Sequence, residues 1–262
     1  MGLIRGILFT AASTVFFFAV LLSALFFTVG SSLDYPNVQS QITALSGQFI
    51  QQNDLLQQID NNLALAKRLC TSAGSDFKIN YQNYTFRLPC KDVNQSASVI
   101  LNDTIKNFVS DLYYTDYNCG FIDCFDKYQP TFLISEKSRN YWYHNLYFSM
   151  SAVLLSGVAL FFLVKKKRHF PFLVGIFGVI SALILLGISK ALNSIPNEIL
   201  SRITGIFFSK AGYIFLIMLI ISAGFLFAGL VIEFYRVEFR IYNMFQKPEE
   251  SGKDKNQKAK KK

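Results

Sequence analysis

Four uncharged apolar runs dominate the pattern of hydrophobic and polar positions along the chain. They occupy residues 7–29, 145–164, 170–189 and 211–232, and none contains Asp, Glu, Lys, Arg or His. A helix needs about 20 residues, each rising roughly 1.5 Å, to cross the hydrocarbon core of a bilayer. The pattern therefore predicts four transmembrane helices. The first run exceeds the h-region of a signal peptide, usually about 7–15 residues, so we expect it to be retained as a signal-anchor helix.

The segment between the first two runs, residues 34–140, is called the interspan segment here. From Val38 to Cys70, apolar or small side chains recur at spacings of four and three, which predicts one long helix or two antiparallel helices broken near Asn53. Alternation on both sides of Gln82 and Asn83 predicts a β-hairpin or one irregular strand. Helical spacing from Val93 to Leu112 predicts a further helix. The interspan segment is therefore expected to be a small, mostly helical domain.

Small residues recur at four-residue spacing within the apolar runs. Such pairs allow helices to approach closely, either within one chain or between chains, and packing within the chain is the simpler interpretation. The pairs are Ala152 with Ser156, Gly178 with Ala182, and Gly224 with Ala228.

Composition supports a membrane protein. The 262 residues are 52% hydrophobic and only 16% charged, whereas average soluble chains carry roughly a quarter charged residues. This composition excludes an ordinary soluble enzyme and a disordered chain.

The excess of 26 basic over 17 acidic residues is explained by topology. Arg5 precedes the first run, a basic loop separates the second and third, and nine Lys or Arg residues follow the fourth, whereas the loop at 190–210 has only three. Cytoplasmic flanks retain positive charge. We therefore expect a cell-membrane protein with both termini in the cytoplasm and the interspan segment outside.

The expected fold class is an integral membrane, mainly α protein. Four transmembrane helices carry a small, disulfide-stapled, mostly helical extracytoplasmic domain between the first two, in which a β-hairpin is possible. Residues 1–33 form the cytoplasmic N-terminus and the first transmembrane helix, and residues 34–140 form the extracytoplasmic domain. Residues 141–232 form transmembrane helices two to four with short loops, and residues 233–262 form a cytoplasmic juxtamembrane helix and a Lys-rich tail.

All four cysteines lie in the interspan segment, as an oxidising compartment would favour. Three disulfide pairings exist for Cys70, Cys90, Cys119 and Cys124. We favour Cys70 with Cys90 and Cys119 with Cys124, because short loops cost the least entropy to close. Zinc is the alternative, but the gaps of 19, 28 and 4 residues do not repeat a paired-ligand motif. No metal or other cofactor is therefore expected.

Three Asn-x-Ser/Thr triplets in the interspan segment are candidate glycosylation sites, at Asn83, Asn94 and Asn102. Two basic clusters are candidate contacts for anionic lipid headgroups, which attract near-surface cations. They comprise Lys165, Lys166, Lys167 and Arg168 in the loop, and Lys258, Lys260, Lys261 and Lys262 in the tail. We expect Pro248 and Ser251-Gly252 to end the helix beyond the fourth span, and the tail from Lys253 to Lys262 to be disordered.

No catalytic motif accompanies these features. The sequence contains no P-loop, GxSxG, HExxH or dinucleotide-binding fingerprint, and its two histidines, His144 and His169, are predicted at opposite membrane faces. The span count and large first loop are similar to those of claudin-like tetraspan proteins. Their Trp-Gly-Leu-Trp-Cys-Cys type of signature is missing, since the only Trp is Trp142, and no family follows.

These observations predict a non-enzymatic protein that acts as a surface, scaffold or accessory subunit through its extracytoplasmic domain. The expected partners are membrane lipids with anionic headgroups at the cytoplasmic face, and another protein or a second copy of the chain. Nucleic acid is not expected, because no folded module or aromatic platform supports it. The alternative function is an oligomeric channel or transporter component.

Overall fold

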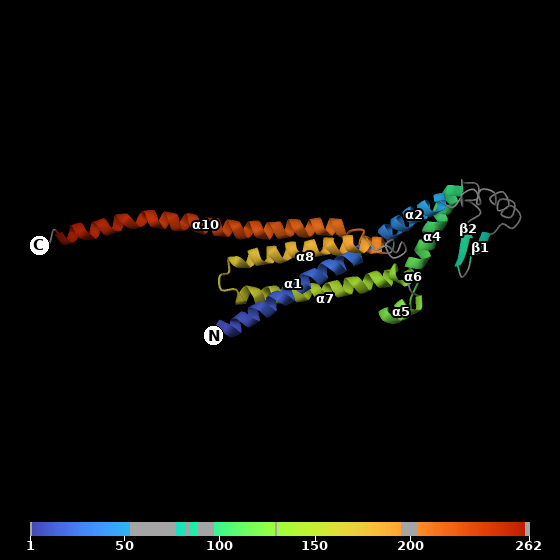
Figure 1. The fold of residues 1–262 in the computed structure, drawn as a ribbon, viewed down its shortest axis with the longest axis horizontal. Helices are drawn as coiled ribbons and strands as arrows, with labels where there is room; N and C mark the ends of the chain where they lie inside the picture. Colours follow the sequence, from blue (N-terminus) through green and yellow to red (C-terminus); the bar gives the residue numbers. More distant parts are fainter. Residues whose placement is uncertain are drawn as a thin grey trace. The chain divides into compact units, whose positions relative to one another are not determined.

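The computed structural model describes residues 2–52, 77–81, 84–88, 97–128, 130–194 and 204–259. Helices make up most of this part of the chain (Figure 1). In order, its elements are α1 (Gly2–Ser32), α2 (Tyr35–Gln52), β1 (Phe77–Tyr81), β2 (Tyr84–Leu88), α4 (Ala97–Tyr113), α5 (Phe121–Tyr128), α6 (Pro130–Leu133), α7 (Glu136–Leu163), α8 (His169–Asn193) and α10 (Ala211–Ala259).

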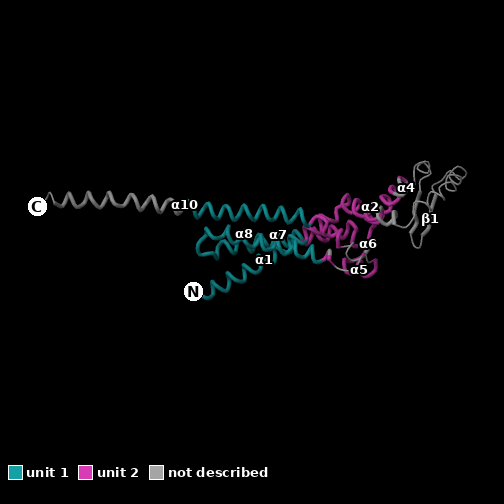
Figure 2. Tube along the Cα trace, turned by 45° about the horizontal axis from the view of Figure 1, so that its top comes forward, with its two compact units in different colours: residues 1–25, 146–191, 211–262 teal, residues 26–145, 192–210 magenta. Residues whose placement is uncertain are grey.

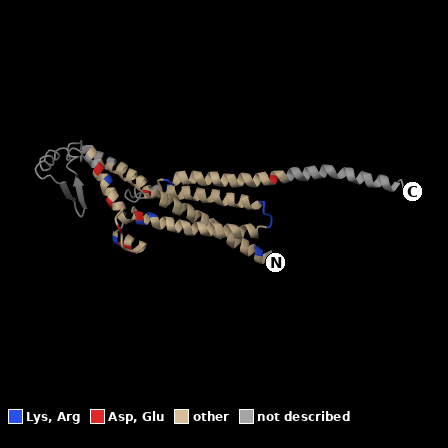
Figure 3. Cartoon of the chain, turned by 180° about the vertical axis from the view of Figure 1, so that it is seen from behind, with Lys and Arg blue, Asp and Glu red and all other residues tan. Residues whose placement is uncertain are grey.

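Four helices are long and apolar enough to cross a membrane, which confirms the predicted number of spans. They run over Leu3–Ser32, Glu136–Leu163, His169–Leu192 and Thr204–Tyr235. Along these four helices, the described charged residues lie near the helix ends (Figure 3). The helices are longer than the apolar runs because helical hydrogen bonding continues past the apolar stretch.

The chain divides into two compact units (Figure 2). Unit 1 comprises residues 1–25, 146–191 and 211–262, and unit 2 comprises residues 26–145 and 192–210. Unit 1 therefore contains most of the four apolar helices. Unit 2 contains the interspan segment, the helix ends that adjoin it in sequence, and residues 192–210.

Small residues bring helices together in unit 1. A Cβ atom added at Gly175 of α8 would lie 2.7 Å from Leu226 Cγ and 2.9 Å from the Ser222 carbonyl oxygen, both on α10. Gly178 also faces Ser222, so the small-residue pair that begins at Gly178 packs within the chain. Gly224 has no neighbour of this kind within 4 Å among the described residues.

A hydrogen bond and aromatic contacts join α1 to its neighbours in unit 1. The Ser23 hydroxyl donates to the Ser149 hydroxyl of α7 over 2.9 Å, and both serines are buried. Phe16 and Phe17 pack on Phe177 of α8, with ring centroids about 6 Å apart. These contacts are the packing and polar interactions that hold helices together where the surrounding lipid is itself apolar.

The core of unit 2 joins the end of α1 to α2 and α4. Its fully buried members include Leu33, Val38, Val109 and Tyr113. The turn between α1 and α2 is short, and the Asp34 carbonyl accepts hydrogen bonds from the amides of Asn37 and Val38 at 2.9 and 3.0 Å. These bonds form the first turn of α2 directly after the first span.

The remaining interspan elements are described in part. The strands β1 and β2 pair antiparallel, with Tyr81 opposite Tyr84, in the segments where alternation suggested a hairpin. Helix α4 begins at Ala97 and ends at Tyr113. The predicted long helix coincides with α2 up to Gln52, and its remainder lies outside the described residues.

The expected end of the last helix at Pro248 was wrong, and so was the disordered tail as far as Ala259. Helix α10 runs from Ala211 to Ala259. Proline destabilises a helix by removing one hydrogen bond and crowding the preceding turn. The Lys, Glu, Gln and Ala residues around it have high helix propensities that favour continuation.

Candidate functional site

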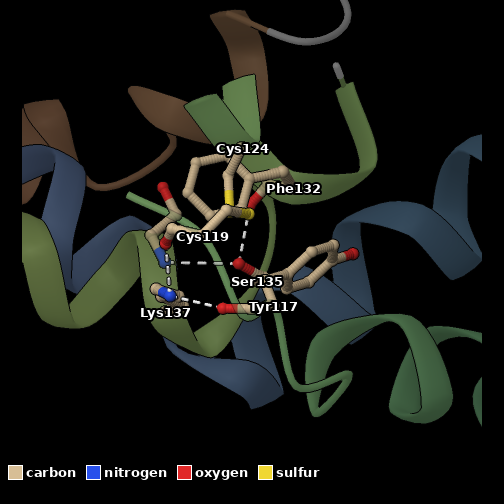
Figure 4. The surroundings of a disulfide bond; sticks show 7 residues. Tyr117, Cys119, Cys124, Phe132, Ser135 and Lys137 are labelled. Carbon is tan, nitrogen blue, oxygen red and sulfur yellow. Dashed lines mark hydrogen bonds between the residues drawn. A yellow bond between two sulfur atoms is a disulfide. The ribbon is translucent and has the colours of Figure 1, made fainter. Parts of the chain in front are cut away.

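The first candidate site is built around a disulfide between Cys119 and Cys124 (Figure 4). This is one of the two pairings that loop length favoured. Cys124 lies on α5 and is fully buried together with Phe132, and Tyr117 packs against both. The disulfide therefore ties the beginning of a short helix to the loop that precedes it.

Hydrogen bonds from α7 and the turn before it hold the same loop. The Lys137 ammonium donates to the carbonyl oxygens of Tyr117 and Cys119, the latter over 2.6 Å. The Ser135 hydroxyl donates to the Phe132 carbonyl over 2.6 Å, and the Ser138 amide donates to the Ser135 hydroxyl over 3.2 Å. Lys137 thus acts as a cap for two backbone carbonyls.

Aromatic stacking fixes α5 against the start of α7. The ring of Phe121 stacks on Tyr141 with centroids 3.9 Å apart, and it meets Trp142 edge-on at 6.0 Å. Trp142 in turn contacts Phe26 at the end of α1. Tyr141 and Trp142 are aromatic residues of the kind that gather at membrane–water interfaces.

Helix α5 leaves an apolar face uncovered by the described part of the chain. Ile122 is 75% exposed and Phe125 is 44% exposed, and these residues are three apart on one side of the helix. Tyr128, three residues further on, is also exposed. We call Ile122, Phe125 and Tyr128 the α5 face.

A charged cluster, the Asp34 cluster, joins three chain segments within unit 2. One carboxylate oxygen of Asp34 accepts a hydrogen bond from Arg139 Nε at 2.8 Å, and the other pairs with Lys210 Nζ at 3.2 Å. The Lys210 amide donates to the Ser32 hydroxyl at 3.2 Å. Asn37 donates to the Ser32 carbonyl and to the Ser209 hydroxyl.

Tyr113 connects this cluster to the core. Its hydroxyl donates to the Leu33 carbonyl over 2.9 Å, and the ring is almost completely buried. Burial raises the pKa of Tyr113 to about 12, against a lowering by the nearby Arg139 and smaller raising effects of neighbouring carboxylates. The phenol therefore stays protonated and donates its hydrogen bond throughout the physiological range.

The basic loop between α7 and α8 lies beside other charged residues of unit 1. Arg5 Nε donates to the Leu163 carbonyl over 3.0 Å. Arg168 forms an ion pair of 3.1 Å with Glu233, and its Nε atom is buried with no acceptor among the described residues. The ammonium of Lys167 lies 5.0 Å from the ring centroid of Phe161.

The other predicted site residues are described to different extents. Asn102 lies on α4 with its side chain half-buried and its Oδ1 atom buried. Lys258 falls within the bounds of α10, and its side chain is not described. Outside the described residues lie Cys70, Cys90, Asn83, Asn94, Lys260, Lys261 and Lys262. Within the described residues no group of three or more His, Cys, Asp or Glu side chains is arranged to hold a metal ion.

Sequence patterns did not single out several of these residues. Asp34 precedes the first turn of a helix, where its sequence position indicates only a favourable charge near exposed amides. Its two cationic partners are 105 and 176 positions away, so no local spacing relates them. Lys137 and the α5 face likewise depend on contacts between elements.

Comparisons of the chain with protein-family models, with curated proteins and with solved structures gave no match.

Proposed function

We propose that this protein is a non-enzymatic, multi-pass protein of the cell membrane that acts as a surface, scaffold or accessory subunit. In this proposal the domain formed by residues 34–140 is extracytoplasmic and contacts another protein or a second copy of the chain.

The α5 face is the observation that carries this proposal. A disulfide, the buried Phe132 and the Phe121–Tyr141 stack all hold α5 in place. An immobilised helix loses little conformational freedom on binding, which favours a specific contact. Exposed aliphatic and aromatic side chains on such a helix are the usual anchors of a protein interface.

Contacts within unit 1 support the proposed topology. The hydrogen bond from Arg5 to Leu163 brings the N-terminal part of α1 to the loop between α7 and α8. The ion pair between Arg168 and Glu233 brings the same loop to α10 beyond the fourth apolar run. These positive segments therefore share one end of unit 1, as a common cytoplasmic face requires.

The experiment that tests the proposed function is site-specific photo-crosslinking in the membranes of cells that naturally contain the protein. A photoreactive amino acid replaces Ile122 on the α5 face. We expect one dominant protein adduct, either with a distinct partner or with a second copy. A matched probe at Val99, an apolar α4 residue that is 42% exposed, should not give this adduct.

The substitutions Ile122→Ser and Phe125→Ser should abolish the adduct formed by a probe at Tyr128 without changing the amount of folded protein. The contrary result is a probe at Ile122 that labels only lipid or water. In that case the α5 face inserts into the membrane interface and the proposed partner contact is wrong.

A further inference from the structure

The four apolar helices of unit 1 line a cavity of about 660 Å³ that is open to its surroundings. This volume lies within the range of roughly 300–1,000 Å³ that small-molecule sites in proteins occupy. Each of the four helices contributes to the wall. Phe16 comes from α1, Leu154 from α7, Val174 from α8 and Ile221 from α10.

The wall of the cavity is almost entirely hydrocarbon. Of the side chains that line it, only Ser222 carries a hydroxyl group, and Met218 contributes a thioether. Water and ions need several polar partners in a site of this kind. An alkyl chain needs none, and it packs against apolar helix surfaces in a membrane through van der Waals contacts.

One end of the cavity is marked by aromatic residues close to the basic loop. Phe161, Phe162 and Phe170 line the wall, and Phe161 contacts Phe170 edge-on at 5.4 Å. These residues flank the loop that carries four successive basic residues from Lys165 to Arg168. The Lys167 ammonium lies over the ring of Phe161, so a cation contacts a residue that lines the cavity.

The charges at this end favour an anionic ligand. Glu233 neutralises Arg168 in part, while Lys165, Lys166, Lys167 and Arg5 add positive charge to the same end of unit 1. The buried Nε–H group of Arg168 has no acceptor among the described residues, although buried donors are normally satisfied. A phosphate oxygen is a suitable acceptor for a guanidinium group.

We propose that this cavity binds one acyl chain of an anionic glycerophospholipid, whose phosphate lies at Lys167 and Arg168. The proposal rests on the four helices lying in a bilayer, and it is independent of the partner contact proposed for the α5 face. It goes beyond general attraction of lipids to basic residues, because the acyl chain is held between helices and the headgroup at a defined end of the cavity.

Substitutions on α7 separate the cavity from the outer surface of the same helix. Leu154 lines the cavity and Leu155 does not, and both side chains are largely exposed. Leu154→Trp should fill the cavity, while Leu155→Trp adds the same bulk on the surface. Lys167→Gln removes the rim cation, and Lys127→Gln on α5 makes the same change of charge in unit 2.

The full-length protein is reconstituted in nanodiscs that contain equal amounts of phosphatidylglycerol and phosphatidylcholine with identical acyl chains. The protein is then released from the nanodiscs, and native mass spectrometry counts the lipid molecules that stay bound to it. We expect one phosphatidylglycerol molecule to be retained, with a preference over phosphatidylcholine of about fivefold or more. One near-surface cation attracts an anionic headgroup strongly enough to give a preference of this size. Leu154→Trp should cause loss of this retained lipid, because its indole ring occupies the space of the acyl chain, and Leu155→Trp should not.

Lys167→Gln should reduce the preference for phosphatidylglycerol about fivefold, while Lys127→Gln should leave it unchanged. Equal melting temperatures of the four variants exclude misfolding as the cause. Two results would overturn the proposal. The first is equal retention of the two lipids by the unaltered protein, and the second is equal retention by Leu154→Trp and Leu155→Trp.

Discussion

Asp34 shows how much a single residue contributes to unit 2. Its carboxylate pairs with Arg139 and Lys210, and its backbone carbonyl begins α2. About 30% of the Asp34 side chain is exposed, so solvent partly screens these ion pairs. Their contribution to the free energy of unfolding is therefore closer to that of surface ion pairs than to that of fully buried ion pairs. Their main effect is to fix which segments meet.

Tyr113 provides a prediction at the scale of one residue. Burial raises its pKa in the folded protein to about 12, above the ordinary value of 10.0. Between these values the folded state binds more protons than the unfolded state, so stability falls as the pH rises. The contribution is fully present below pH 10 and is lost as the pH approaches 12.

At pH 11 this loss amounts to about 1.4 kcal/mol. Tyr113→Phe lacks the titrating group, and its stability should decline less steeply between pH 9 and pH 11. The measurement is the melting temperature in detergent across this interval. Tyr114→Phe, which changes an exposed neighbouring ring, is the matched control and should follow the unaltered protein. Parallel curves for Tyr113→Phe and the unaltered protein would contradict the assignment.

At the residue scale, spacing predicted the Cys119–Cys124 disulfide, because closing a short loop depends on local chain entropy. Loop length could not predict the hydrogen bonds of Lys137, because its acceptors are carbonyl oxygens 18 and 20 positions away. A carbonyl oxygen is present at every residue, so sequence gives no sign of which one a lysine caps.

Helix α5 is the element whose structure depends most on a crosslink. It has only eight residues, well below the length of about 12–15 residues at which isolated helices become marginally stable in water. Its buried side consists of Cys124 and Phe121, while its opposite side is exposed. The disulfide and the aromatic stack therefore supply the stability that helix length does not.

Replacing both Cys119 and Cys124 by serine should loosen α5 without unfolding the spans. The loop closed by this disulfide spans a sequence separation of 5, for which loop entropy alone gives about 2 kcal/mol. Hydrogen–deuterium exchange of peptides from α5 should increase, while exchange in α7 beyond Leu146 stays unchanged. Asp126→Asn, on α5, is the control for a substitution that keeps the disulfide. Unchanged exchange in α5 would mean that packing alone holds the helix.

The apolar helices could be predicted well because each has to satisfy its own backbone hydrogen bonds in a membrane. Their number followed from composition and run length. The extent of α10 did not follow, since a proline predicts a helix end only in the absence of stronger local preferences. The spacing in α4 indicated its helical type.

For the whole molecule, the proposed topology makes a direct prediction. Epitope tags at the N-terminus and C-terminus should be detected only after cells are permeabilised, and a tag inserted after Asp116 should be detected on intact cells. The reason is that the positive flanks share one end of unit 1, and the positive-inside rule assigns that end to the cytoplasm. A tag inserted after Lys166 serves as a second cytoplasmic marker. Surface detection of either terminus would reverse the proposed orientation.

The four apolar helices, the location of the charged residues and the short disulfide loop all followed from the amino-acid sequence. These features depend on local composition and on short chain separations, which sequence patterns report directly. Tertiary structure alone decided the partners of Asp34, the exposed α5 face and the apolar cavity with a cation on its wall. The partners of Asp34 and the wall of the cavity come from separate segments of the chain, and the exposure of the α5 face depends on which residues pack against that helix. All three follow from packing, which no single stretch of sequence encodes.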